Sequence, residues 1–144
     1  MRVLIVSMVA TALSLSACAS PERESAPPLA NTSWIATEIG GVPVSPPGRV
    51  TLNIQTGQIG GNGSCNSYGG DVVVDGASIK IGPVISTQMA CLENNLMAQE
   101  NRYFQLLQRA SRIERIGLGQ LVITTSDGQK IIFRLSPIAA RLSN

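Results

Sequence analysis

The sequence predicts a mainly β protein of the α+β class, in which about eight short antiparallel strands form a small barrel with one α-helix. Short segments of alternating apolar and polar residues recur along the chain, separated by glycine, proline and aspartate turns. Only one stretch has the longer period of an amphipathic helix. Because strands and helices do not alternate, an antiparallel sheet is expected, and eight strands can close it into a barrel without exposed edges.

Five strands are predicted before the helix and three after it. Residues 49–55 alternate most clearly, with all of their large apolar side chains on one face. The first strand after the helix is irregular, since Ile113 and Ile116 share a face only if the strand contains a bulge. The predicted strands are residues 33–39, 49–55, 58–62, 68–74, 78–82, 111–116, 120–125 and 129–135.

The helix is predicted over residues 94–110, with Asn94 or Asn95 capping its first turn. Its apolar residues form one stripe, which we interpret as core packing rather than as a ligand site. The stripe consists of Leu96, Tyr103, Leu107 and Ala110, flanked by Met97 and Phe104.

The N-terminal residues are typical of a secretory leader. Arg2 precedes an apolar run at residues 3–13, which is short for a membrane span. Residues 15–18, Leu-Ser-Ala-Cys, resemble the lipobox of bacterial lipoproteins, in which the leader is removed and the cysteine is acylated. We therefore expect residues 1–17 to be a signal peptide and Cys18 to be the lipidation site. The alternative is a plain leader with a chance cysteine.

Residues 18–30 are predicted to be a tether between the lipid and the domain, because they contain three prolines and little to bury. In the enterobacterial sorting pattern, an aspartate directly after the lipidated cysteine favours the inner membrane. This chain has Ala19 at that position, so the resemblance implies the outer membrane. Multiple acyl chains anchor a protein stably without a transmembrane helix. The predicted location is the outer membrane, with the domain facing the periplasm.

Composition excludes several functions. The 11 basic and 9 acidic residues leave no electrostatic footprint for nucleic acid, so no nucleic-acid partner is predicted. Histidine is absent, which removes Ser-His-Asp and Cys-His catalysis and the commonest zinc ligand. No catalytic residue, cofactor or metal site is predicted.

A glycine-rich stretch at residues 57–70 contains Cys65, whose obvious partner is Cys91. In an exported chain of this size the two are most simply a disulfide, worth about 3 kcal/mol by loop entropy. Two free thiols, a redox centre or half of a metal site are the alternatives. A phosphate loop is a weak interpretation of the stretch, because it lacks the Gly-Lys-Ser/Thr ending and no helix follows it.

The carboxylates show no local pairing of the kind that general acid–base catalysis needs. Glu100 stands out because it lies near the apolar stripe of the helix. We interpret it as a hydrogen-bonding partner for Arg102, Arg109 or a nearby backbone amide.

Several short motifs occur together in one order. They are Asn-Thr-Ser-Trp at 31–34, Cys-Asn-Ser-Tyr-Gly-Gly at 65–70, Ser-Thr-Gln-Met-Ala-Cys at 86–91, Met-Ala-Gln-Glu at 97–100 with Tyr103, Phe104 and Leu107, and a closing strand with Phe133. With these motifs the chain resembles the META domain family, also called HslJ-like after a bacterial heat-shock lipoprotein, over residues 31–136. Ser64 departs from the glycine that this family usually has before the cysteine. The resemblance implies a lipocalin-like β fold with one helix and a link to heat, envelope or antibiotic stress, and it implies no reaction.

The leading functional hypothesis is a non-enzymatic, lipid-anchored envelope module that binds another protein or stabilises the cell surface under stress. The alternative is a carrier of small hydrophobic ligands, which we disfavour because a chain of this length needs its apolar interior for its own core. Exposed loops are the expected contact surface, namely the proline loop at residues 42–48 and the glycine stretch at residues 60–67.

Overall fold

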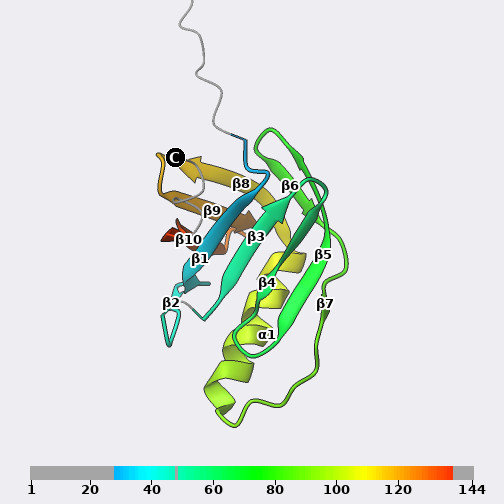
Figure 1. The fold of residues 1–144 in the computed structure, drawn as a ribbon. Helices are drawn as coiled ribbons and strands as arrows, with labels where there is room; N and C mark the ends of the chain where they lie inside the picture. Colours follow the sequence, from blue (N-terminus) through cyan, green and yellow to red (C-terminus); the bar gives the residue numbers. More distant parts are fainter. Residues whose placement is uncertain (1–27, 48, 138–144) are drawn as a thin grey trace, which may run out of the picture.

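The computed structural model describes residues 28–47 and 49–137, which form ten strands and one α-helix (Figure 1). In chain order these are β1 (Thr32–Ile39), β2 (Val42–Pro43), β3 (Thr51–Gln55), β4 (Gln58–Asn62), β5 (Ser67–Asp75), β6 (Ser78–Ile81), β7 (Ile85–Ser86), α1 (Asn94–Gln108), β8 (Ala110–Ile116), β9 (Gln120–Thr125) and β10 (Lys130–Leu135). The predicted leader and Cys18 lie outside the described residues.

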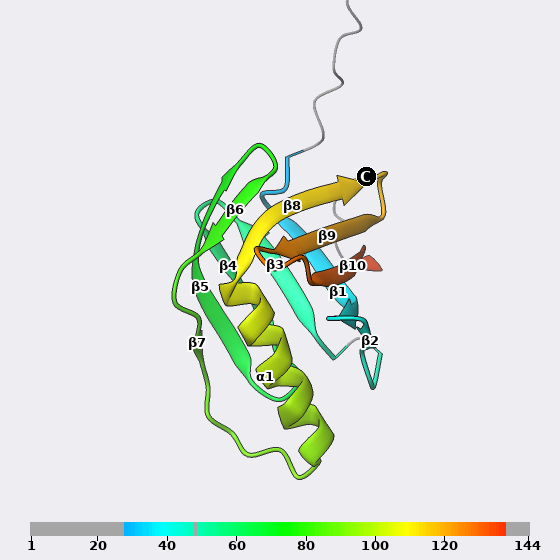
Figure 2. The same ribbon diagram turned by 180° about the vertical axis from the view of Figure 1, so that it is seen from behind.

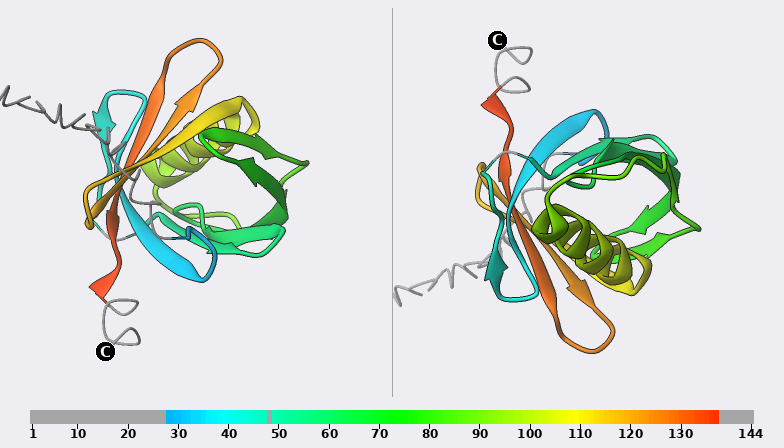
Figure 3. Two further views of the ribbon diagram at one scale, coloured as in Figure 1. Left: turned by 90° about the horizontal axis from the view of Figure 1, so that it is seen from above. Right: turned by 90° about the horizontal axis from the view of Figure 1, so that it is seen from below.

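Eight of the strands close into an antiparallel barrel, as predicted. The strand order is β10-β9-β8-β6-β5-β4-β3-β1, and β1 pairs with β10 to close the ring (Figure 3). The short strands β2 and β7, which the sequence did not predict, add to β1 and β5. Closure satisfies the backbone of the first and last long strands, which would otherwise be exposed edges.

The ring is weakest where β6 meets β8. These strands share one ladder pair, Ser78 with Arg112, and the Ile113 N–H donates to the Ala77 carbonyl at 2.9 Å. By contrast, β8 and β9 pair along their whole length. Fewer backbone hydrogen bonds therefore hold β6 to β8 than hold β8 to β9.

The helix α1 packs against β1, β9 and β10 and leads into β8, and in Figure 2 it lies beside β5. Its buried face adds Leu106 to the predicted stripe, whereas Ala110 lies beyond the helix and begins β8. The predicted asparagine cap is wrong, because the N-cap residue is Glu93 and its side chain makes no capping hydrogen bond. Within residues 28–47 and 49–137, no helix is both long and apolar enough to cross a bilayer.

One hydrophobic core lies inside the barrel and under α1. Trp34, Tyr103 and Phe133 are its largest side chains and are fully buried. Leu29, which lies in the predicted tether, also packs against this core.

The irregularity of β8 has a different solution from the one expected. Ile113 is buried, but Ile116 is 55% exposed, so the two do not share a face. The register shift lies between Ala110 and Arg112, immediately after the helix. The bulge thus accommodates the change from helix to strand rather than the second isoleucine.

Candidate functional site

Two features of the domain could carry function, a buried polar cluster beside the disulfide and an open pocket at one end of the barrel. The cluster is organised around the bond between Cys65 and Cys91, whose Cα atoms are 5.9 Å apart. This disulfide is the pairing that the sequence favoured. It joins the glycine-rich stretch to the segment that precedes α1.

Glu100 is the centre of the cluster and is almost completely buried. Its Oε2 atom accepts hydrogen bonds from the backbone N–H groups of Cys65, at 2.9 Å, and Asn66, at 2.6 Å. Its Oε1 atom accepts one from Asn66 Nδ2 at 2.7 Å. The backbone-amide interpretation is therefore correct, whereas Arg102 and Arg109 are not its partners. The amides are near in space but 34 and 35 residues away in sequence.

Asn66 connects Glu100 to the segment before the helix. Its Oδ1 atom accepts hydrogen bonds from Thr87 Oγ1, at 2.9 Å, and from the Met89 N–H, at 2.7 Å. Since Nδ2 faces Glu100, the orientation of the amide is fixed on both sides. The side chain therefore holds three separate segments of the chain together.

Gln99 makes a second set of connections. Its Nε2 atom donates to Ser64 Oγ at 2.9 Å, and its Oε1 atom accepts from the Ser45 N–H at 2.9 Å. The backbone φ of Ser64 is +139°, a value that favours glycine, which agrees with the glycine usual in the resembled family. A serine at this position adds a hydroxyl that accepts the hydrogen bond from Gln99.

The glycine stretch is packed rather than presented to solvent. A Cβ atom at Gly63 would lie 2.5 Å from Phe104 Cζ, and one at Gly61 would overlap the Thr51 carbonyl. Ser64 and Asn66 are buried. The prediction that residues 60–67 form an exposed contact loop is therefore wrong for most of the stretch.

Two buried tyrosines lie next to the cluster. The hydroxyl oxygens of Tyr68 and Tyr103 are 2.6 Å apart, and Tyr68 donates to the Thr51 carbonyl at 3.0 Å. Burial raises the pKa of both phenols well above the ordinary value. They therefore keep their protons at neutral pH and act as core hydrogen-bonding groups.

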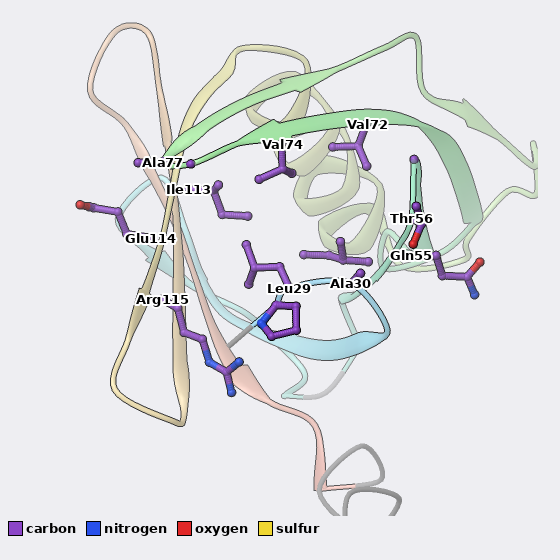
Figure 4. A pocket seen from close by; sticks show the side chains of 14 residues that line it. Leu29, Ala30, Gln55, Thr56, Val72, Val74, Ala77, Ile113, Glu114 and Arg115 are labelled. Carbon is purple, nitrogen blue, oxygen red and sulfur yellow. The ribbon is translucent and has the colours of Figure 1, made fainter. Parts of the chain in front are cut away.

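The pocket is separate from this cluster and lies at the end of the barrel where the chain enters β1 (Figure 4). Its volume is about 720 Å³. The walls come from the segment before β1, the β3–β4 turn, β5, the β5–β6 turn and β8. The apolar part of the lining consists of Pro28, Leu29, Ala30, Ile54, Val72, Val74, Ala77 and Ile113.

Arg115 lies at the rim of this pocket, with its guanidinium carbon 5.4 Å from the centre of the Trp34 ring. Its Nη2 atom donates to the Leu118 carbonyl at 3.3 Å, whereas its buried Nε has no acceptor among the described residues. The neighbouring Glu114 is paired with Arg112 at 2.7 Å, and this ion pair lowers the pKa of the Glu114 carboxyl. Of the lining residues that the structure describes, Arg115 is therefore the charged one without an ionic partner.

The family model of the META domain matches residues 27–137. The chain belongs to the META domain family. This match covers the whole described barrel, including the Leu29 segment that the sequence motifs did not reach.

Solved structures show the same fold as this META domain. An NMR structure of a protein from Burkholderia xenovorans is 22% identical, with a TM-score of 0.62 over 83% of this chain and 98% of that one. A crystal structure of a DUF4847 family protein from Bacteroides vulgatus is 13% identical, with a TM-score of 0.54 over 74% and 93%. No curated protein matches the chain.

The sequence found the polar cluster of the META domain in part and missed its pocket. The cysteines and Glu100 were singled out, but Asn66 and Gln99 carried no separate signal. Pocket residues come from five segments of the chain, and each looks like ordinary strand or turn sequence. Among the described residues, no group of acidic or cysteine side chains is arranged to hold a metal ion.

Proposed function

We propose that this protein is a lipid-anchored envelope protein whose META domain binds a small apolar ligand and catalyses no reaction. The observation that carries the proposal is the pocket at the open end of the barrel. Its volume of about 720 Å³ is within the range of about 300–1,000 Å³ that is usual for small-molecule sites. The core therefore leaves more space than the length of the chain suggested.

The pocket favours the carrier hypothesis over a module that binds only proteins. Eight of its lining residues are apolar, and the pocket is partly open to solvent. The polar cluster argues against catalysis by Glu100. Both of its carboxylate oxygens already accept hydrogen bonds from N–H groups, and the residue is buried. The two tyrosines hold their protons too tightly for acid–base chemistry at neutral pH.

Anchoring through Cys18 would keep the pocket near the membrane. Ten peptide units lie between Cys18 and Pro28, a pocket-lining residue, and they span at most about 35 Å. We propose that the domain faces the periplasm from the outer membrane and acts during heat, envelope or antibiotic stress.

A protein partner at the exposed part of residues 42–47 is compatible with this function, since Val42 is 44% exposed.

Binding is tested with the neutral fluorescent probe N-phenylnaphthylamine. Val74 lines the pocket, whereas Val73 on the same strand is 67% exposed and does not. Val74→Trp should therefore obstruct the pocket at the β5 wall and remove most of the fluorescence increase, and Val73→Trp should leave it unchanged. Equal binding by the two variants, or no binding by the natural protein, would contradict the proposal.

Anchoring is tested by separating membranes from soluble proteins after expression of the natural chain and of Cys18→Ser. The natural protein should partition into detergent, and the variant should lose this behaviour. If Cys18→Ser still partitioned like the natural protein, the proposed anchor would be wrong. This result would leave the ligand site untouched, so the two parts of the proposal are tested separately.

A further inference from the structure

The pocket combines an apolar interior with one cation at its rim. Its described lining contains two charged residues, Glu114 and Arg115. Because Glu114 is held by Arg112 at 2.7 Å, its charge is already balanced within β8. Arg115 has no such partner within the described part of the chain. Its hydrogen bond to the Leu118 carbonyl comes from Nη2, so the N–H groups of Nη1 are not used by that bond.

The position of Arg115 is fixed by its neighbours. The guanidinium carbon lies 5.4 Å from the centre of the Trp34 ring, and Trp34 is fully buried. Contact with the face of an aromatic ring holds a cation without neutralising it. Arg115 is thus a positioned charge at the edge of an apolar space, able to hydrogen-bond to an anionic group.

The opposite wall is suited to an alkyl chain. Val72 and Val74 from β5 face Leu29 and Ile113 across the pocket in Figure 4. Val74 is 37% exposed although it lines the pocket, so a ligand there would remove apolar surface from water. Among residues 28–47 and 49–137, no acidic side chain other than the paired Glu114 lines this space.

We propose that the pocket binds a single-chain amphiphile with an anionic head group, whose chain lies against the β5 wall and whose head group contacts Arg115. This inference rests on the proposed function, because it names the ligand class of the same pocket. A free fatty acid and an anionic lysophospholipid share this chemistry. The charge at the rim disfavours cationic amphiphiles of the same chain length.

The test uses residues 18–144 with Cys18→Ser, exported behind a cleavable leader that adds no lipid. These residues contain the closed barrel, its core and the disulfide, so the domain is complete. Dodecanoate, dodecanol, dodecyltrimethylammonium and dodecanoyl lysophosphatidylglycerol are compared by displacement of N-phenylnaphthylamine, below the concentration at which each forms micelles.

The decisive variant is Arg115→Met, which keeps an apolar stem next to Trp34 but removes the charge. It should weaken dodecanoate binding about tenfold, or 1.4 kcal/mol, and leave dodecanol binding unchanged. Arg134→Met is the matched control, because Arg134 is exposed on β10 and does not line the pocket. It removes the same charge and should change neither affinity. Thermal melting of each variant shows whether the fold is kept.

The possible outcomes separate this inference from the proposed function. Suppose that dodecanoate binds equally well to the natural protein and to Arg115→Met, while dodecanol binds and Val74→Trp blocks its binding. The proposed preference for an anionic head group is then wrong, and the proposed apolar ligand site is kept. If nothing displaces the probe, or Val74→Trp has no effect, both proposals fail. If both anions depend on Arg115, the stronger of the two identifies the source as free fatty acid or phospholipid.

Discussion

Replacing Glu100 by glutamine tests whether the buried polar cluster stabilises the domain. The substitution keeps the size of the side chain and replaces one oxygen with an NH2 group. If the remaining oxygen takes the place of Oε2, it keeps the bonds from the Cys65 and Asn66 N–H groups. The new NH2 group then faces Asn66 Nδ2, which donates to Oε1 in the natural protein. Asn66 cannot turn its amide without breaking its bonds to Thr87 and Met89.

The magnitude follows from these contacts. A hydrogen bond to a charged group contributes about 1.5–3 kcal/mol, and one such bond is lost outright. The two backbone bonds to Oε2 persist without the charge, which lowers each by about half. These terms sum to about 3–6 kcal/mol, and the lower cost of burying a neutral amide offsets part of the loss. We therefore expect Glu100→Gln to lower the free energy of unfolding by about 3 kcal/mol, and the melting temperature by about 12 °C.

The assay is thermal and urea unfolding followed by circular dichroism, with the disulfide intact in every variant. Glu93→Gln is the matched control, since Glu93 is exposed at the helix start and its side chain makes no cap hydrogen bond. It should unfold like the natural protein. The double variant Glu100→Gln/Asn66→Asp restores an acceptor opposite the new NH2 group and should recover about 1 kcal/mol.

An unchanged or higher melting temperature in Glu100→Gln would refute this reasoning. It would mean that the desolvation free energy of the buried carboxylate is as large as the stabilisation from its three hydrogen bonds. The lack of any recovery in the double variant would show that the loss has another origin than the Asn66 contact.

Three further outcomes are expected. Cys65→Ser should cost about 3.5 kcal/mol by loop entropy for the 26-residue separation, and a melting curve equal to that of the natural protein would argue against a structural disulfide. Gly61→Ala should lower the free energy of unfolding by about 2–4 kcal/mol, because its Cβ would overlap a backbone carbonyl. Gly119→Ala meets open space and should lower it by less than about 1 kcal/mol, both measured by urea unfolding. Tyr68 and Tyr103 are the chain's two tyrosines, and their pKa values are raised in the fold, so stability is full below about pH 10 and falls as the pH rises further. Tyrosinate absorbance should therefore increase together with unfolding, and titration of either phenol in the folded protein would contradict this.

Local patterns in the sequence determined the secondary structure and the fold class of this protein. Alternation along residues 49–55 and the stripe through Leu96, Tyr103 and Leu107 depend on the period of a strand or a helix, which is a property of neighbouring residues. Both appear in the structure as β3 and α1. The pairing of Cys65 with Cys91 followed from the small number of cysteines in a chain that the sequence predicts to be exported.

The tertiary structure alone decided which residues surround Glu100 and where the chain leaves an open space. The partners of Glu100 lie 34 and 35 residues away, and the pocket joins Leu29, Val74 and Arg115 from three distant segments. No periodic pattern encodes such distances, because they arise when the eight strands close and bring remote segments together. Burial has the same origin: Asn66 has a polar side chain in a glycine-rich stretch, yet packing against α1 makes it part of the interior.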